Sequence, residues 1–353
     1  MVGGLLFVEP FSILFCMLKG KKDLRLDLDT RCNFKCRYCD NSSLDPATKI
    51  SIPLEQLENV FRSAEKNCWS LYLSCAGEPL VNSKFPEIME LLSKTVHTPD
   101  ISMVTNALLL NERNRRLILD SPIDRLFISM DSLDPEIYTK WCNVSVESFQ
   151  KVVSHIESFA KERLQRGKPH MIVTAIAMKD TLEGLPDIAR WLAKLKVSAF
   201  NIQWLNSMDH DYLRDEQLDL SDPVVSEKVH SVLSSVRDIL KGSGVLLDYP
   251  RTVSKEKIAS VWMNRRLWRN KFHYFGDILQ KLSAKRRGQP CRFAKNTFYL
   301  WPDGHLKGCP ADGFETLNIF DGTHTLESEM ERVCSMVDSR EIRHCDGCLF
   351  KME

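Results

Sequence analysis

The sequence carries almost no net charge, and it contains no repeated or low-complexity segment. Its 48 Lys and Arg residues balance 47 Asp and Glu residues, which leaves a formal charge of +1 over 353 residues. A chain balanced in this way has no strong overall attraction to nucleic acid. Its length allows a large core, and we expect one large domain accompanied by a smaller one.

The sequence also lacks an apolar run long enough to cross a membrane. Residues 1–18 are apolar, but Glu9 and Pro10 interrupt them, and no positive charge precedes them as in a signal peptide. We expect residues 1–21 to be an extension that adds a strand or helix to the main domain, with membrane association as the open alternative. Eight of the twelve cysteines cluster near the two ends of the chain in ligand-like spacings, which favours metal chemistry in a reducing cytoplasm.

Strand-like and helical runs alternate between Lys22 and about Leu205. The strict apolar and polar alternation from Leu24 to Asp29 begins the series, and five later runs also have strand character. This order implies a parallel sheet wrapped by helices, but six units are too few for a closed eight-stranded barrel. The expected strands are 24–29, 70–74, 100–104, 125–130, 171–177 and 199–204, and the expected helices are 51–61, 85–94, 111–120, 145–166, 185–195 and 223–241.

Three closely spaced cysteines follow the first strand. The run CNFKCRYC places Cys32, Cys36 and Cys39 so that one loop can bind three corners of a [4Fe–4S] cube. The fourth iron would then lack a protein ligand and could bind a small molecule. Zinc is the competing interpretation, although structural zinc sites usually combine two pairs of Cys or His ligands.

A second group of cysteines lies near the C-terminus. Cys291 and Cys309 flank two strand-like runs that meet at the turn signal of residues 302–304, so a β-hairpin would bring the two thiols together. Cys345 and Cys348 form a second close pair. Two pairs of thiolates suit either zinc or a fully ligated iron–sulfur cluster, and the spacing alone leans towards zinc.

Residues 231–288 differ in character from the rest of the chain. The segment from Arg251 to Arg287 contains eleven Lys and Arg residues with five aromatic residues among them. We interpret residues 231–288 as an amphipathic helical bridge whose aromatic side chains pack on the preceding domain. Contact with an anionic substrate or with nucleic acid is the alternative.

The first cysteine loop, with aromatic Tyr38 before the last cysteine, resembles the CxxxCxΦC signature of the radical S-adenosylmethionine (SAM) superfamily. The resemblance implies that the open iron chelates SAM. It also implies that the reduced cluster cleaves SAM to a 5′-deoxyadenosyl radical, which abstracts hydrogen from a substrate. The implied fold is α/β, an open, partial (β/α)6 TIM-like barrel over residues 22–230, with Tyr38 near the adenine.

The loop after the second strand resembles the GGEP element of the same superfamily. Gly77 would let the backbone approach a ligand closely, and the Glu78 carboxylate and nearby carbonyls can accept hydrogen bonds from the SAM ammonium group. Ala76 replaces the first glycine of the element. Cys75 beside this loop is a candidate catalytic residue that could return a hydrogen atom to a substrate radical, as in radical SAM epimerases, with plain packing as the alternative.

The next two strand ends also match the superfamily. Thr105-Asn106 resembles its TNG element, and the run from Ser129 to Asp131 resembles SxD. The resemblance implies that Thr105, Asn106 and Ser129 contact SAM, and that Asp131 contacts SAM or substrate as a catalytic residue. The family's GxIxGxxE element is not legible after the fifth strand, so the adenine contacts on that side stay open.

The C-terminal cysteines follow the pattern C-x12-G-x4-C and then CxxC, which resembles the SPASM/twitch extension of radical SAM enzymes. This resemblance reverses the preference for zinc and implies an auxiliary [4Fe–4S] cluster in a small β-hairpin and helix domain over residues 289–353. Because only five residues follow Cys348, we expect the shorter twitch form with one cluster. The expected ligands of this cluster are Cys291, Cys309, Cys345 and Cys348.

Together these resemblances predict a cytoplasmic radical SAM oxidoreductase. The auxiliary cluster would accept an electron or orient the substrate, so that a small molecule or a protein-borne residue undergoes two-electron oxidation or crosslinking. A flavodoxin- or ferredoxin-type protein would donate electrons. The alternatives are a radical SAM epimerase, a peptide- or protein-modifying maturase and, from another class, a metal-binding regulatory or nucleic-acid-binding protein.

Overall fold

Parallel strands run through most of the chain and form one open sheet. The computed structural model describes residues 22–42, 44–45, 49–74, 76–97, 100–205, 211–249, 296–308 and 317–339. Over these residues the sheet has nine strands in the order β7-β6-β5-β4-β3-β2-β1-β8-β9. Their bounds are β1 Asp23–Leu26, β2 Ser70–Leu73, β3 Ile101–Thr105, β4 Arg125–Ser129, β5 His170–Ala177, β6 Ala199–Trp204, β7 Leu246–Asp248, β8 Thr297–Leu300 and β9 Leu306–Lys307.

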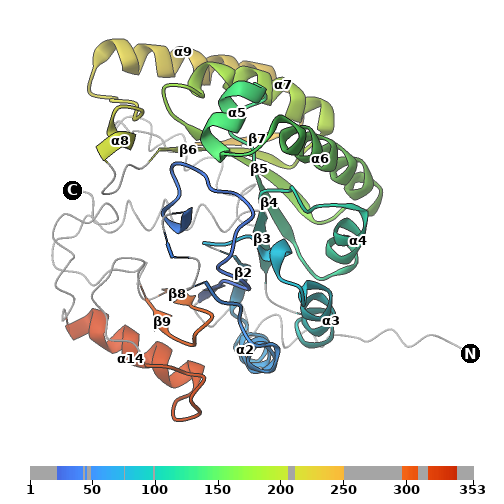
Figure 1. Cartoon of the computed structure of the whole chain (residues 1–353), viewed down its shortest axis with the longest axis vertical. Helices are drawn as coiled ribbons and strands as arrows, with labels where there is room; N and C mark the ends of the chain where they lie inside the picture. The colour runs from blue at the N-terminus through green and yellow to red at the C-terminus, as the bar shows by residue number, and fades with distance from the viewer. Residues whose placement is uncertain are drawn as a thin grey trace, which may run out of the picture.

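Helices connect successive strands from β1 to β7, which keeps those strands parallel. Most of these helices line the outer face of the curved sheet, and the loop between β1 and α2, drawn in dark blue, lies on its inner side (Figure 1). The helices are α2 Leu54–Asn67, α3 Phe85–Thr95, α4 Glu112–Asp120, α5 Pro135–Cys142, α6 Val146–Arg166, α7 Leu185–Leu195, α8 Asp211–Arg214, α9 Pro223–Leu240 and α14 Leu326–Ser339, with short 3-10 turns η1 Asp40–Ser42, η3 Pro79–Val81 and η4 Leu182–Gly184.

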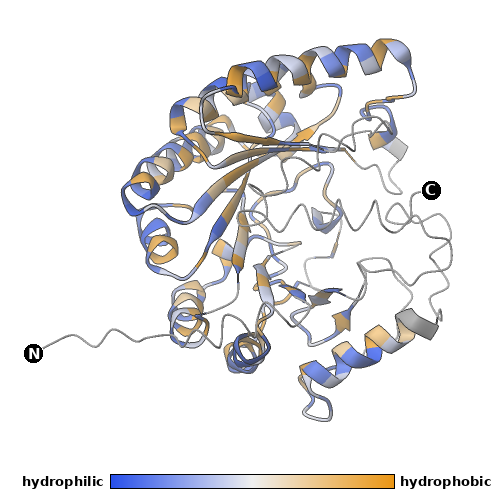
Figure 2. Cartoon of the chain, turned by 180° about the vertical axis from the view of Figure 1, so that it is seen from behind, coloured by the Kyte–Doolittle hydropathy of each residue, from blue (hydrophilic) through white to orange (hydrophobic). Residues whose placement is uncertain are grey.

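The core lies between the sheet and the outer helices. In β1 and β4, buried and half-buried residues alternate, so that Leu24, Leu26, Leu126 and Ile128 pack under the helices. The orange colour of the strands and of the sheet-facing sides of the helices shows the same layer (Figure 2). Because each fully buried Leu or Ile contributes roughly 1.5–3 kcal/mol, the apolar pattern of the strands fixes which side faces the helices.

The predicted α/β fold with a parallel, open sheet is confirmed, and its six predicted strands and their helices are present. The predicted hairpin around Gly304 is also present, since β8 and β9 pair antiparallel. Sequence reasoning missed α5, β7 and the parallel pairing of β8 with β1. These features involve a helix of eight residues and strands of three and four residues, too short for a clear periodic signal.

The expected end of the barrel at residue 230 needs correction. That position falls inside α9, which continues to Leu240, and β7 then pairs with β6 in the same sheet. The sheet therefore includes β7 and, by the same criterion, the β8–β9 hairpin of the expected C-terminal domain, because all three strands are hydrogen-bonded into it. The expected N-terminal extension, residues 1–21, and residues 250–288 of the expected basic bridge lie outside the described residues.

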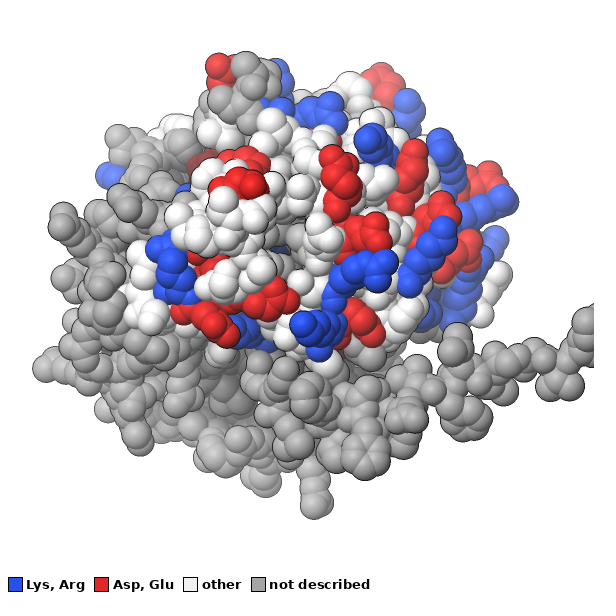
Figure 3. Space-filling model, turned by 90° about the horizontal axis from the view of Figure 1, so that it is seen from below, with Lys and Arg blue, Asp and Glu red and all other residues white. Residues whose placement is uncertain are grey.

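Within the described parts of the chain, no helix is both long and apolar enough to span a bilayer. Charged side chains of both signs are mixed over the described surface shown in Figure 3. Several acid–base pairs occur at helical spacing, including Arg62 with Glu58 and Arg116 with Glu112. The mixed surface agrees with the balanced composition of the sequence.

Candidate active site

The cysteine loop leaves the carboxyl end of β1 and turns sharply. Cys32, Cys36 and Cys39 are free thiols that are half-buried. The Cys39 N–H donates to the Cys36 carbonyl at 3.2 Å, and the backbone N–H of Phe34 points at the Cys32 sulfur from 3.4 Å. Three thiols on one tight loop, with a backbone donor directed at one sulfur, are a donor set that fits iron–sulfur ligation.

Burial affects the protonation of Cys32 and Cys39. It raises the pKa of Cys32 to about 12, aided by the charges of Glu78, Cys36 and Cys39, and it also raises the pKa of Cys39. Iron binding must therefore displace protons from sulfur. No group of three or more His, Cys, Asp and Glu side chains among the described residues lies at the spacing of a single bound ion. The ligands of a cubane bind different iron atoms and stand further apart.

The loop after β2 packs directly on the backbone that leads into the cysteine loop. The Asp27 carboxylate accepts the N–H groups of Ala76 at 2.8 Å and Gly77 at 3.4 Å, and the Glu78 N–H donates to the Arg31 carbonyl at 2.9 Å. A Cβ on Gly77 would lie 1.9 Å from the Asp29 carbonyl oxygen. The close approach that requires glycine here is thus to this chain's own backbone.

Glu78 is a buried link between two strand ends. Its carboxylate accepts hydrogen bonds from the Thr105 hydroxyl at 2.8 Å, the Asn106 N–H at 2.7 Å and the Leu80 N–H at 3.1 Å. Burial nevertheless raises the pKa of Glu78 to about 7. Thr105 and Glu78, both expected to contact SAM, therefore already bond to each other and hold the ends of β2 and β3 together.

The raised pKa of Glu78 predicts a specific pH dependence of stability. Between the ordinary glutamate pKa of 4.5 and about 7, the folded chain holds a proton at Glu78 that the unfolded chain releases. Stability should therefore fall as pH rises through this window, by about 3 kcal/mol in total. Urea unfolding of wild type and of Glu78→Gln should show this slope in the difference between the two proteins. A difference that does not change with pH would contradict the prediction.

Asn106 joins the end of β3 to the cysteine loop. Its Nδ2 group donates to Asn33 Oδ1 at 2.7 Å and lies 3.7 Å from Cys32 Sγ. The structure thus brings the predicted residues Cys32, Glu78 and Asn106 into one hydrogen-bonded group. Asn33 was not predicted, and neither was Asp27, although its place at the end of the first strand is the same signal that identified the other strand ends.

Tyr38 and Asp131 form a buried pair across the site. The Tyr38 hydroxyl donates to the Asp131 carboxylate, which also accepts the Ile176 N–H at 2.8 Å. Burial raises the pKa of both groups. Asp131, predicted to be catalytic, is therefore engaged in fixing the cysteine loop to β4 and β5.

Helix α5 also contacts the cysteine loop. The Arg37 N–H donates to the Trp141 carbonyl at 2.8 Å, and the rings of Tyr38 and Trp141 stack with centroids 6.5 Å apart. Tyr138 of the same helix contacts Phe34 edge to face at 6.4 Å. The missed helix therefore holds residues on both sides of Cys36.

Removing the Tyr38 hydroxyl should destabilise the protein. In Tyr38→Phe, the Asp131 carboxylate loses one donor while remaining buried, which should lower the free energy of unfolding by about 1–3 kcal/mol. Asp131→Asn is the matched control, because its amide can still accept from Ile176 and donate to the Tyr38 oxygen. Urea unfolding should show a smaller loss for the control, and equal losses would argue against the bond as the cause.

The structure does not place the remaining predicted residues in this hydrogen-bonded group. Ser129 is the half-buried last residue of β4 and stands opposite Thr174 in the sheet. The other candidates, which fall outside the described residues, are Cys75, Cys291, Cys309, Cys345 and Cys348.

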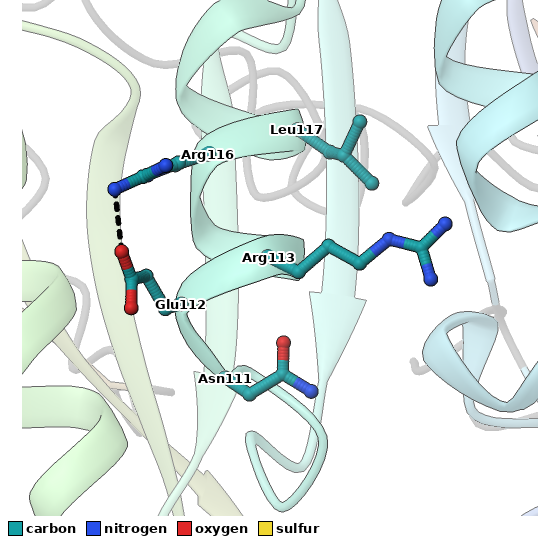
Figure 4. A pocket seen from close by; sticks show the side chains of 5 residues that line it. All are labelled: Asn111, Glu112, Arg113, Arg116 and Leu117. Carbon is teal, nitrogen blue, oxygen red and sulfur yellow. Dashed lines mark hydrogen bonds and ion pairs between the residues drawn. The ribbon is translucent and has the colours of Figure 1, made fainter.

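A hollow at the start of α4 is separate from the predicted residues. It has a volume of about 550 Å³ and includes the ion pair of Arg116 with Glu112, while Arg113 extends from the opposite side of the helix (Figure 4). Its lining residues are Asn111, Glu112, Arg113, Arg116 and Leu117, none of which belongs to the cysteine site.

Comparison with known proteins matches the part of the chain that contains the cysteine loop. A family model described as "Radical SAM superfamily" matches residues 29–196. The probable GTP 3′,8-cyclase of Methanococcus aeolicus is 30% identical over 180 residues, which cover 50% of this chain and 57% of that protein. The probable GTP 3′,8-cyclase of Sulfolobus acidocaldarius is 34% identical over 169 residues, covering 46% and 50%. This chain thus spans about half the length of the curated relatives it matches.

Solved structures share the fold. Streptococcus suis SuiB bound to S-adenosylmethionine superposes with a TM-score of 0.65 at 15% identity, covering 94% of this chain and 71% of that chain. Histidine-tagged anSMEcpe with bound AdoMet gives 0.61 at 18% identity, covering 93% and 84%. At these identities the likeness concerns the fold alone.

Proposed function

We propose that the protein, whose residues 29–196 match the radical SAM superfamily, is a radical SAM oxidoreductase. The observation that carries the proposal is the position of the three free thiols. They lie at the carboxyl end of β1, where the Gly77-Glu78 loop packs on the chain before them and Asn106 reaches Cys32. These strand ends meet at one edge of the sheet, where ligands of such sheets bind.

Cys32, Cys36 and Cys39 would hold the [4Fe–4S] cluster. When bound, the cluster would supply the electron for reductive cleavage of SAM, and so the radical chemistry that removes a hydrogen atom from a substrate. The chain's own residues position and shield this chemistry. Tyr38 and Asp131 hold the cysteine loop to β4 and β5. Helix α5 contacts the same loop through the hydrogen bond to the Trp141 carbonyl.

A second cluster would make the outcome an oxidation. Cys291, Cys309, Cys345 and Cys348 would hold it, and it would supply an acceptor for the electron that the substrate radical must lose. Support comes from the cysteine spacing and from the β8–β9 hairpin, which ends just before Cys309. The proposed substrate is a small molecule or a protein-borne residue, and the proposed electron donor is a flavodoxin- or ferredoxin-type protein in the cytoplasm.

A radical cyclisation of a purine nucleotide is the second candidate. It is favoured by the relatives named probable GTP 3′,8-cyclases. Incubation with GTP, SAM and reductant distinguishes the candidates, because only a cyclase would consume GTP as deoxyadenosine forms.

Iron and sulfide analysis of anaerobically purified protein tests the main proposal. About eight irons per chain, together with 5′-deoxyadenosine formed on adding SAM and reductant, would support two cubanes. About four irons with one zinc would contradict the auxiliary cluster. Zinc alone, without deoxyadenosine, would overturn the radical function.

A further inference from the structure

Two asparagine side chains meet beside Cys32, one from the cysteine loop and one from the end of β3. The Asn106 Nδ2 group lies 2.7 Å from Asn33 Oδ1 and 3.7 Å from the Cys32 sulfur. Asn33 immediately follows Cys32 in the chain. An amide donor from a different strand is therefore directed at one of the three thiols of the loop.

Neighbouring groups fix the direction in which each amide faces. The Leu108 N–H donates to Asn106 Oδ1 at 3.0 Å, so the Nδ2 group of Asn106 must face the cysteine loop. Asn33 then presents its oxygen to Asn106 and, at 3.9 Å, to the protonated Cys32 thiol, and its own Nδ2 group makes neither contact. The Asn106 N–H is held by Glu78 at 2.7 Å, so the arrangement is anchored on both sides.

The Nδ2 atom of Asn33 is buried and has no hydrogen-bond partner among the described residues. Leaving a buried donor unpaired costs about 1–3 kcal/mol, and such atoms are rare in folded proteins. A group that binds at the cysteine loop would therefore supply the missing acceptor. The thiolate and sulfide atoms of an iron–sulfur cluster are acceptors of this kind.

We propose that Asn33 and Asn106 donate amide hydrogen bonds to the cluster sulfurs around Cys32 and thereby raise its reduction potential. The inference rests on the proposed function, because it requires a cluster at this loop. Reduction adds one negative charge to the cluster, and N–H donors stabilise the more negative state more strongly. Asn33 and Asn106 are thus positioning residues that act through the cluster ligands.

Two variants of Asn33 separate the donor from other effects. Asn33→Leu removes the donor without adding charge, whereas Asn33→Asp is nearly isosteric and keeps an oxygen for the bond to Asn106. Asn114→Leu is the matched control. Asn114 is also half-buried, but its Nδ2 group donates to the Leu109 carbonyl at 2.7 Å and does not contact a cysteine.

The readout is the midpoint potential of the cluster in the reconstituted full chain, from a redox titration followed by electron paramagnetic resonance without SAM. We expect both Asn33 variants to lower the ratio of reduced to oxidised cluster about tenfold at a fixed potential, a shift of about 59 mV for one electron. The control should match wild type. Asn33→Leu and Asn33→Asp with full iron and unchanged potentials would overturn the inference, even if SAM binding weakens. A wild type without iron at this loop would instead defeat the proposed function itself.

Discussion

Replacing Cys36 with alanine should abolish 5′-deoxyadenosine formation. Cys36 is the middle thiol of the loop, and the cluster would lose one of only three protein ligands. We expect a loss greater than the 10–100-fold typical of residues that merely support a metal ligand. Iron content and deoxyadenosine formed per hour measure the effect.

Cys142→Ala is the matched control for that variant. Cys142 is a buried thiol at the end of α5 that interacts directly with the Cys36 side chain, but it is outside the ligand motif. The control should retain its iron and its deoxyadenosine formation. Equal losses in the two variants would mean that thiol packing, rather than iron ligation, explains the requirement for Cys36.

Replacing Gly77 with alanine should disrupt the same site through the backbone. The new Cβ would lie 1.9 Å from the Asp29 carbonyl oxygen and 2.9 Å from that of Arg31. Neither backbone atom can move without shifting the segment that leads into Cys32. We therefore expect a loss of about 3 kcal/mol or more in stability, together with poor iron incorporation.

Gly184→Ala provides the control for this second prediction. A Cβ at Gly184 meets only the Ser132 hydroxyl oxygen, at 3.9 Å, and the backbone there has φ −81°. Urea unfolding and iron analysis should find this variant close to wild type. A Gly77→Ala protein with normal stability and full iron would show that the two loops can separate without loss.

These two predictions concern different properties of one site. Cys36 concerns the chemistry of the ligands, whereas Gly77 concerns the packing that places them. The link through Glu78 and Asn106 connects the two, because it ties the Gly77-Glu78 loop to the strand end that contacts Cys32. The loop that resembles a SAM-binding element is therefore also part of the support of the cysteine loop.

Much of the fold could be predicted from the sequence, because the signals are local. Apolar periodicity located β1 to β6, and caps or apolar spacing located their helices within a few residues. Helix α5 was missed because its eight residues are too few for a clear apolar periodicity. The pairing of β8 with β1 was missed because it joins segments more than 270 residues apart.

The sequence by itself determined the thiol set and the order of strands, since the spacing of Cys32, Cys36 and Cys39 limits what one loop can bind. Only the tertiary structure decided how the polar strand ends are used. Asp131 bonds to Tyr38, and Glu78 bonds to Asn106, because parallel strands bring their carboxyl ends to one edge. Burial at that edge makes an unpaired polar group costly, so most of these groups bond to one another, and the choice of partner depends on distances that no local pattern records.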